Sequence, residues 1–215
     1  MLVIGINGSP RKGWNTSTLV SDALEGASSA GADTEMVDLY DHLYSGCRSC
    51  FGCKRVGVED HKCYVKDDLT GVLDRCRQAD ALVIGSPVYF GQVTADLAAF
   101  LERFLYPYST YSLDPQTFCP KKVPTAFIYT MNVGQDGMES MRPAFGRYET
   151  IAGRLLGEEP KHHYALDTWQ YSDYDRYMHS VFDVESKRVQ REEVFPKDRE
   201  ACREMGARLV SRVLS

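Results

Sequence analysis

The chain has 215 residues, a formal net charge of −5, and a composition that is 43% hydrophobic and 26% charged. These values are typical of one globular domain and exclude a disordered chain. Lys and Arg form no basic stripe, so nucleic acid is not an expected partner. No apolar run approaches the ~18 residues that a membrane helix needs. We therefore expect a single domain over residues 1–215, without a membrane partner.

The beginning of the chain and its cysteines indicate the compartment. The chain opens on the apolar run 2–6, with no basic segment or small-residue cleavage site before it, so no signal peptide is expected. The chain holds seven cysteines. Without an export signal, such cysteines more often bind metal, act in catalysis or lie buried than form disulfides. The expected location is the cytoplasm.

Apolar runs and helical spacings alternate along the chain. The expected strands are 2–6, 34–39, 81–85, 123–129 and a weaker one near 162–166. The expected helices are 16–29, 67–78, 94–105, 138–156 and 198–214. The strands show no polar alternation, which is typical of a parallel sheet covered by helices on both faces. Two segments interrupt this order: a cysteine-rich loop at about 44–66, and an excursion at about 167–197 that is rich in Tyr, Asp and charge.

The first strand runs into a polar loop, residues 8–18, and a helix follows at once. Unpaired backbone N–H groups at a helix start favour an anion. Ser9, Thr16 and Ser17 add hydroxyl groups, and Arg11 adds a guanidinium that can bind phosphate oxygens. The loop therefore indicates a phosphate site. The alternative is an ordinary helix start with Asn15 as its N-cap.

Two familiar phosphate motifs are excluded by the residues of this loop. Gly8 and Gly13 match the start of a P-loop, but Trp14 and Asn15 occupy the positions where Lys and Ser/Thr are required. No G-x-G-x-x-G follows the strand, so a Rossmann dinucleotide site is unsupported.

A second loop, residues 85–91, follows the third strand and contains Tyr89 and Phe90. In a flavodoxin-like sheet of order 2-1-3-4-5, strands 1 and 3 flank the switch point where FMN binds. The first loop would hold the flavin phosphate, and the second would lie against the ring. The alternative is that both aromatic side chains pack in the core.

The fourth strand ends in a third candidate flavin loop, which contains Asn132. Its amide can donate to a ring carbonyl, where charge develops in reduced flavin. A plain Asn/Gly turn is the alternative.

Together the loops resemble those of the NAD(P)H-dependent FMN reductase family and its iron–sulfur flavoprotein branch. The matching segments are Gly8-Ser9-Pro10-Arg11 with Asn15-Thr16, Ser86-Pro87-Val88-Tyr89-Phe90-Gly91, and Cys47-x2-Cys50-x2-Cys53 with Asp67-Asp68. The resemblance covers residues 1–135 and thins afterwards. It implies non-covalent FMN, reduction by NAD(P)H, and a homodimer or homotetramer. The fold expected with it is a doubly wound α/β flavodoxin-like fold, with a five-stranded parallel sheet of order 2-1-3-4-5.

These arguments give a leading hypothesis and a residue set. The protein is expected to be an NAD(P)H-dependent oxidoreductase that passes electrons through FMN to a quinone, a free flavin or a protein acceptor. No side chain need act as an acid or base, since the flavin carries the chemistry, and His162 and His163 are interpreted as structural. The expected FMN-binding residues are Ser9, Arg11, Asn15, Thr16, Ser17, Pro87, Val88, Tyr89, Phe90, Gly91, Thr130 and Asn132. The alternatives are an electron carrier without its own substrate, and a thiol or zinc redox sensor.

Four cysteines in the loop at 44–66 form a candidate metal site. Cys47, Cys50 and Cys53 have a spacing that lets three thiolates converge, and Cys63 can supply a fourth. The spacing resembles the motif of iron–sulfur flavoproteins, which implies a 4Fe-4S cluster that exchanges single electrons with FMN. The intervening segment 54–62 is long and charged, so zinc or no metal stay open as alternatives.

The segment 104–111 is rich in Tyr and follows the third expected helix. Tyr is favoured on surfaces that are half buried and half wet, so this segment is expected at a subunit interface. The alternative is a local aromatic cluster beneath residues 167–178.

Overall fold

The computed structural model describes residues 1–214. Its strands form one parallel sheet of order β2-β1-β3-β4-β5. The strands are β1 (Leu2–Asn7), β2 (Asp33–Asp38), β3 (Ala81–Pro87), β4 (Thr125–Thr130) and β5 (Lys161–Ala165). The expected flavodoxin-like topology is therefore confirmed, because the strand order changes direction between β1 and β3.

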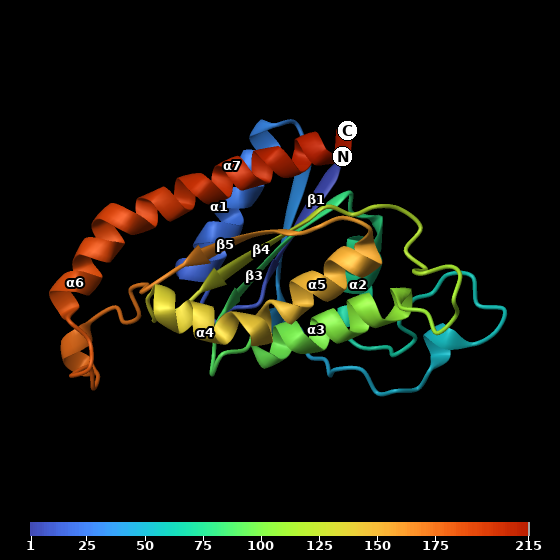
Figure 1. Cartoon of the computed structure of the whole chain (residues 1–215), viewed down its shortest axis with the longest axis horizontal. Coiled ribbons are helices and arrows are strands. Elements are labelled where there is room, and N and C mark those ends of the chain that lie inside the picture. The colour runs from blue at the N-terminus through green and yellow to red at the C-terminus, as the bar shows by residue number, and fades with distance from the viewer. Residues whose placement is uncertain (215) are drawn as a thin grey trace.

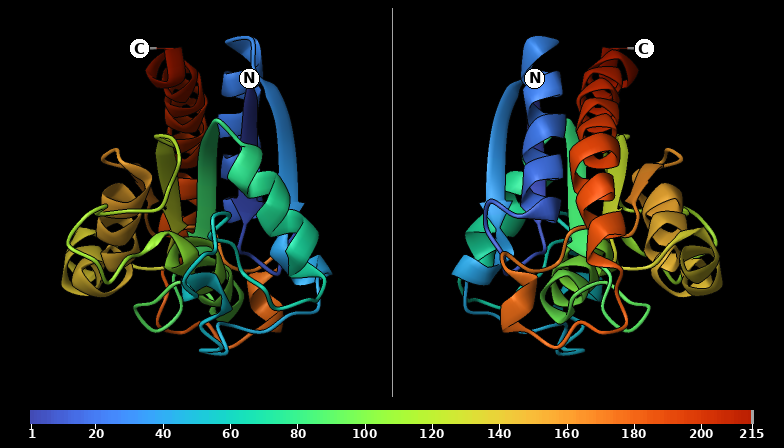
Figure 2. Two further views of the ribbon diagram at one scale, coloured as in Figure 1. Left: turned by 90° about the vertical axis from the view of Figure 1, so that its right-hand side faces the viewer. Right: turned by 90° about the vertical axis from the view of Figure 1, so that its left-hand side faces the viewer.

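Helices cover the sheet in two layers (Figures 1 and 2). Helices α1 (Asn15–Ser29) and α7 (Phe195–Leu214) lie on one face. The other face carries α2 (Leu69–Gln78), α3 (Ala95–Leu105), α4 (Gln135–Phe145) and α5 (Arg147–Leu156). None of the helices within residues 1–214 has both the length and the apolarity needed to span a membrane.

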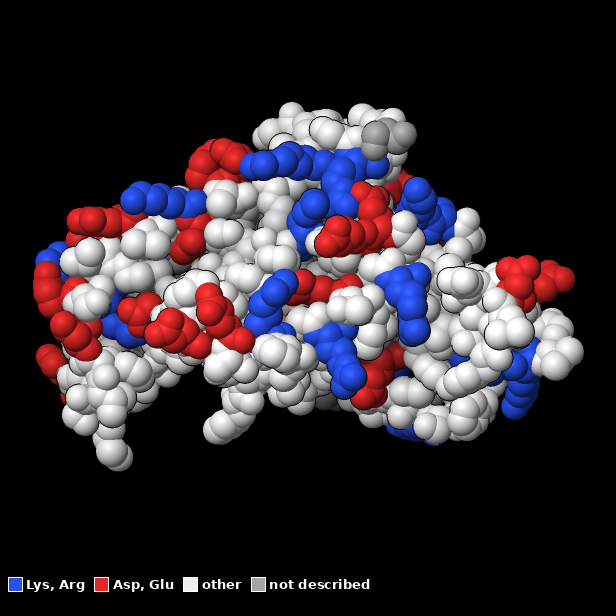
Figure 3. Space-filling model, in the orientation of Figure 1, with Lys and Arg blue, Asp and Glu red and all other residues white. Residues whose placement is uncertain are grey.

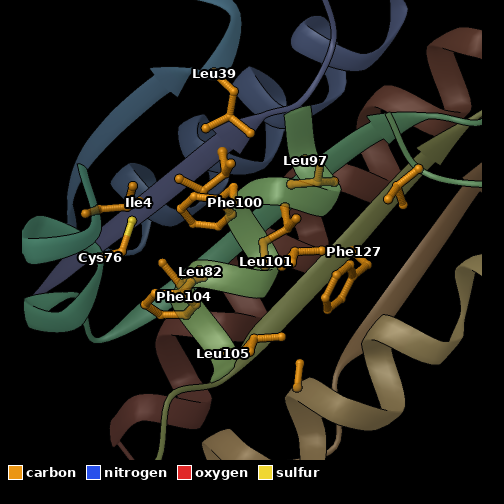
Figure 4. Packing of buried hydrophobic residues seen from close by; sticks show 14 of the residues in the cluster. Ile4, Leu39, Cys76, Leu82, Leu97, Phe100, Leu101, Phe104, Leu105 and Phe127 are labelled. Carbon is orange, nitrogen blue, oxygen red and sulfur yellow. The ribbon is translucent and has the colours of Figure 1, made fainter. Parts of the chain in front are cut away.

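Successive residues of each central strand are buried on opposite faces, which explains their unbroken apolar runs. In β1, Ile4 packs toward α2 and α3, while Val3 packs toward α1 and α7. Figure 4 shows the larger of the two cores, in which Phe100 and Phe104 of α3 lie against the sheet. On the face drawn in Figure 3, the Lys and Arg side chains are interspersed with Asp and Glu.

Two expected helices differ from those observed. The helix expected over 138–156 is interrupted at Gly146, which ends α4 and precedes α5. Helix α4 also contains Pro143, which cannot donate a backbone hydrogen bond and so weakens a continuous helix. The last helix begins at Phe195, and a π-helical turn at Gln190–Val194 joins it to α6 (Val184–Val189). Part of the excursion at 167–197 is therefore helical.

Helices α1 and α7 approach each other at two glycines. A Cβ atom at Gly206 would overlap the backbone carbonyl oxygen of Ala23, and one at Gly26 would overlap that of Arg203. Beside this contact, the buried carboxylate of Asp22 accepts hydrogen bonds from Arg199 (Nε, 2.7 Å) and Arg203 (Nη2, 2.6 Å). The close approach requires glycine, because backbone atoms cannot move aside as a flexible side chain can.

Gly206→Ala should destabilise the protein, and Gly71→Ala should not. Forcing a methyl group into the α1–α7 contact should cost ~1–3 kcal/mol of the free energy of unfolding. Gly71 is exposed in α2, with only the Arg75 side chain near its would-be Cβ. There Ala should add ~0.5–1 kcal/mol, because it lowers the entropy lost on folding. Urea unfolding followed by circular dichroism measures both changes. Equal stability of the two variants would contradict this account of the helix contact.

Candidate functional site

The loops that follow β1, β3 and β4 meet at the carboxyl edge of the sheet. The N–H of Gly8 donates to the carbonyl of Gly85 at 2.8 Å, which joins the first loop to the second. Thr94 Oγ1 donates to the carbonyl of Gly8 at 2.7 Å. The N–H of Val88 donates to the carbonyl of Thr130 at 2.9 Å, which joins the second loop to the third. The structure therefore brings the three predicted loops together at the switch point.

The first loop presents hydroxyl groups at the start of α1. Ser9, Thr16 and Ser17 are buried, and the Thr16 and Thr130 hydroxyl oxygens lie 2.7 Å apart. The N–H of Ser9 donates to Asn7 Oδ1 at 3.0 Å, which shapes the turn after β1. The first turn of α1 contains no acidic residue, so its positive end is not compensated from within the helix.

Asn15 does not cap α1, so the alternative of an Asn15-capped helix start is wrong. The N-cap position belongs to Trp14, and Asn15 is the first helical residue. Its side chain points to the excursion instead: Nδ2 donates to the carbonyl of Trp169 at 2.8 Å, and Oδ1 accepts from Arg191 at 3.1 Å. These contacts come from residues more than 150 positions away in the chain.

The two cations of the first loop have different surroundings. The Arg11 guanidinium lies 4.0 Å from the centre of the Trp14 ring and donates to the carbonyl of Gln170 at 2.5 Å. Lys12 instead pairs with Asp41 at 2.5 Å and with Asp38 at 3.5 Å. The hydrogen bond to Asp41 raises the pKa of Lys12. Arg11 therefore contacts the first loop and the excursion, whereas Lys12 forms ion pairs with two carboxylates.

The second loop exposes its aromatic side chains. Phe90 is fully exposed and Tyr89 is about half exposed, so the alternative that both pack in the core is wrong. A two-residue turn holds them in place, because Tyr89 and Gln92 exchange backbone hydrogen bonds of 2.8 and 3.0 Å. Within this turn Phe90 has φ of 51° and Gly91 has φ of 76°. Phe90 is thus held in a left-handed conformation that is uncommon for a bulky residue. Pro87 and Val88 are partly buried below.

The third loop is bound by the excursion. Asn132 Nδ2 donates to Gln170 Oε1 at 2.5 Å, and Asn132 Oδ1 accepts from Lys187 Nζ. A plain Asn/Gly turn therefore does not account for the two side-chain contacts of Asn132. Trp169, Gln170, Lys187 and Arg191 all contact predicted loop residues, and none of the four is among the site residues predicted from the sequence. The only signal in the sequence was that their segment departs from the strand–helix alternation.

The four cysteines of the loop at 44–66 line one small cavity. Cys47 and Cys50 are exposed, Cys63 is half-buried, and Cys53 is buried. Burial raises the pKa of the Cys53 thiol. Within residues 1–214, no three His, Cys, Asp or Glu side chains are grouped closely enough to hold a metal ion. The chemistry of the donor set suits an iron–sulfur group or zinc, because four cysteines line the same cavity.

Arg103 of α3 fastens the cysteine loop. Its buried guanidinium donates to Asp67 Oδ2 at 2.5 Å and to the carbonyls of Ser45 and Val65 at 3.1 Å each. Nε also donates to the sulfur of Cys63 at 3.4 Å. Donors to sulfur of this kind orient thiolate ligands and stabilise their negative charge. The loop therefore keeps a defined path that depends on residues outside the cysteine motif.

The remaining candidate residues lie away from the three loops. His162 Nδ1 lies 3.2 Å from Glu149 Oε2, and His163 Nε2 lies 3.0 Å from Asp198 Oδ1, so the two imidazoles point to opposite faces of β5. Both histidines of the edge strand β5 thus contact carboxylates of neighbouring helices.

The Tyr-rich segment 104–111 packs on itself and on the cysteine loop. The Tyr106 and Tyr111 hydroxyl oxygens lie 3.1 Å apart, and Lys54 Nζ donates to the carbonyl of Tyr106 at 2.6 Å. Trp169, Tyr171 and Tyr174 form a separate aromatic cluster. Within residues 1–214 no ring contact joins the two groups, so the alternative of one shared cluster is wrong. A subunit interface at 104–111 stays a prediction.

A known family and several relatives match much of this chain. The profile of a family described as NADPH-dependent FMN reductase matches residues 1–150. An iron–sulfur flavoprotein of Methanosarcina thermophila is 26% identical over 201 residues, covering 93% of this chain and 100% of the relative. One from Methanocaldococcus jannaschii is 42% identical over 103 residues, or 48% of this chain. The chain spans about half, 51%, of that relative's length.

Solved structures show the same fold. An NAD(P)H:quinone oxidoreductase from Methanothermobacter marburgensis is 17% identical, with a TM-score of 0.67 over 97% of this chain and 98% of its own. An FMN-dependent NADH-azoreductase from Bacillus anthracis, in complex with FMN, is 13% identical. Its TM-score is 0.62 over 97% of this chain and 98% of its own.

Arg11→Ala should weaken FMN binding, while Lys12→Ala should leave it within about twofold. A charge-assisted hydrogen bond to phosphate contributes ~1.5–3 kcal/mol, so the Arg11 variant should lose roughly tenfold to a hundredfold in affinity. Lys12 serves as the matched control because its ammonium is already paired with Asp38 and Asp41. Quenching of flavin fluorescence by apoprotein measures both dissociation constants.

Riboflavin, which lacks the phosphate, separates the phosphate contact from a general loss of structure. The Arg11 variant and the unchanged protein should bind riboflavin alike. Equal FMN affinity of both variants, or an equal loss for riboflavin, would remove Arg11 from the phosphate site.

Proposed function

We propose that this chain, which belongs to the NADPH-dependent FMN reductase family, binds FMN and passes electrons from a nicotinamide to a quinone, flavin or protein acceptor. The observation that carries the proposal is the meeting of three loops at the switch point of the sheet. One offers hydroxyl groups at a helix start, one offers exposed aromatic rings, and one offers a fixed amide. In a parallel α/β sheet this edge is where ligands bind.

The residues of the first loop suit the phosphate of FMN. The start of α1 supplies backbone N–H groups without intrahelical acceptors, and the first turn of the helix contains no acidic residue. Ser9, Thr16 and Ser17 bring hydroxyl groups to the same turn. The indole Nε1 of Trp14 is buried and has no hydrogen-bond acceptor within the protein, so a bound group could supply one. The backbone N–H groups of the helix start are the donors that would bind the phosphate.

The second and third loops suit the flavin ring. Phe90 and Tyr89 expose aromatic surface at the edge of the sheet, where a flat ring can pack on them. Thr130, at the end of β4, and Asn132, two residues later, add a hydroxyl and an amide at the same edge of the sheet. One N–H of the Asn132 amide is bound to Gln170, and the second stays available for a ring carbonyl.

When bound, FMN would supply the redox chemistry, by accepting a hydride from a nicotinamide and giving up electrons to the acceptor. The chain's own residues would hold the phosphate, fix the plane of the ring and leave one ring face open to the nicotinamide. No acid or base from the protein is needed for hydride transfer. This division of roles agrees with a site that contains hydroxyl groups, amides and aromatic rings.

Reduction by a nicotinamide separates the oxidoreductase from an electron carrier without its own substrate. In anaerobic stopped-flow mixing, NADPH or NADH should bleach the flavin absorbance of the FMN-loaded protein in a process that saturates with nicotinamide concentration. Free FMN at the same concentration is the control. A bound flavin that neither nicotinamide reduces faster than free FMN would favour the carrier.

We also propose that Cys47, Cys50, Cys53 and Cys63 hold a 4Fe-4S cluster. Two observations support this proposal: the four cysteines line one cavity, and Arg103 Nε donates a hydrogen bond to Cys63 Sγ. The M. thermophila relative, which aligns over its whole length, carries the name iron–sulfur flavoprotein. Zinc would suit the same four thiols but would add no redox role.

Anaerobic reconstitution with iron and sulfide should give a broad brown absorbance and about four irons per chain. Cys50→Ala should lose that iron, because it removes one thiolate of the set. Cys119→Ala, at a half-buried cysteine outside the cavity, should keep it. Protein that stays yellow and iron-free would reject the cluster and leave the flavin proposal intact, and stoichiometric zinc would point to the sensor alternative.

A further inference from the structure

A buried lysine of the excursion lies against the third loop. The side chain of Lys187, in α6, is only 3% exposed, although lysine is among the residue types most rarely buried. Its ammonium donates to Asn132 Oδ1 and to Asp167 Oδ1. The nearby ring of Phe182 lies 5.2 Å away. A buried cation needs polar partners. Here they are Asn132, which belongs to the proposed flavin site, and Asp167, at the start of the excursion.

The backbone of the excursion holds this arrangement in place. The N–H of Asp167 donates to the carbonyl of Val133 at 2.9 Å, and the N–H of Thr168 donates to the carbonyl of Met131 at 3.0 Å. These two hydrogen bonds fasten the start of the excursion to the third loop. Asp167 has φ of 49°, a conformation that few non-glycine residues adopt. Both partners of the Lys187 ammonium therefore lie in segments that backbone hydrogen bonds hold together.

The two charges of the pair are not equally shielded from water. Lys187 is 3% exposed, whereas its carboxylate partner Asp167 is 39% exposed. Water screens the half-exposed carboxylate more effectively than the buried ammonium. The side of the pair that faces Asn132 therefore keeps a positive potential. Arg188, the next residue of α6, is exposed and paired with Glu185 and Glu192, so it adds little to that potential.

We infer that Lys187 is a positioning residue that orients Asn132 and favours reduced FMN over oxidised FMN. This inference rests on the proposed function. In the reaction, the nicotinamide loses a hydride and becomes oxidised, and the flavin ring gains that hydride together with one negative charge. A fixed cation in a water-poor site lowers the free energy of the more negative form. Lys187 also holds the Oδ1 atom of Asn132, which keeps the amide N–H group directed away from the ammonium.

Two variants test the charge of Lys187 against a merely structural role. Lys187→Met keeps the length of the side chain and removes the cation, so it should lower the two-electron potential of bound FMN. Asp167→Asn keeps the shape and removes the anion, so it should raise that potential. We expect each variant to change the ratio of reduced to oxidised FMN affinity about tenfold, which is ~30 mV for a two-electron couple. Arg188→Met, one position along α6, should leave the potential unchanged.

The potential is measured by equilibrating FMN-loaded protein with a reference dye during anaerobic photoreduction. Opposite shifts for the two variants support the inference. Shifts in the same direction, or an unchanged potential in either FMN-loaded variant, would overturn it. If Lys187→Met does not fold, the sign of the Asp167→Asn shift decides the question alone. Failure of the unchanged protein to bind FMN is a different result, because it rejects the proposed function itself.

Discussion

The hydrogen bond from Gly8 N–H to the Gly85 carbonyl closes the switch point between β1 and β3, and the candidate site is built around it. Thr94 binds the carbonyl of the same Gly8, so the first loop, the second loop and the start of α3 are joined at this residue. This geometry follows from parallel strands, whose carboxyl ends meet at one edge of the sheet. Three short segments that are far apart in the sequence thereby become one surface.

Helix α3 connects the two proposed redox sites. At its beginning, the Thr94 hydroxyl accepts from Leu97 N–H and donates to Gly8, which fixes the helix beside the flavin loops. Near its end, the buried Arg103 guanidinium binds Ser45 and Cys63 of the cysteine loop, and Asp67 just after it. The helix is buried along one side in the larger core. One helix therefore contacts both the first loop and the cysteine loop.

The excursion packs over the candidate site and contacts the first and third loops. Trp169 and Arg191 bind Asn15, Gln170 binds Arg11 and Asn132, and Lys187 binds Asn132. Each of these contacts joins residues that are far apart in the sequence. The profile of the reductase family ends at residue 150, before this segment. These contacts with the candidate site thus come from a part of the chain that the family match does not include.

The sequence by itself determined the strands of a parallel sheet and the polar loops after them, because fully buried parallel strands leave apolar runs that end in polar turns. The strand order was expected from the resemblance of these loops to a known family, since apolar runs carry no information on order. The sequence also placed the four cysteines in one loop, since their spacing is local. Only the tertiary structure decided what Asn15 binds, that α4 and α5 are separate at Gly146, and that Lys187 lies against the third loop. Local periodicity carries no information on such contacts, because they depend on which distant segment packs over the site. A buried lysine looks the same in a sequence as an exposed one, until the fold supplies its partners.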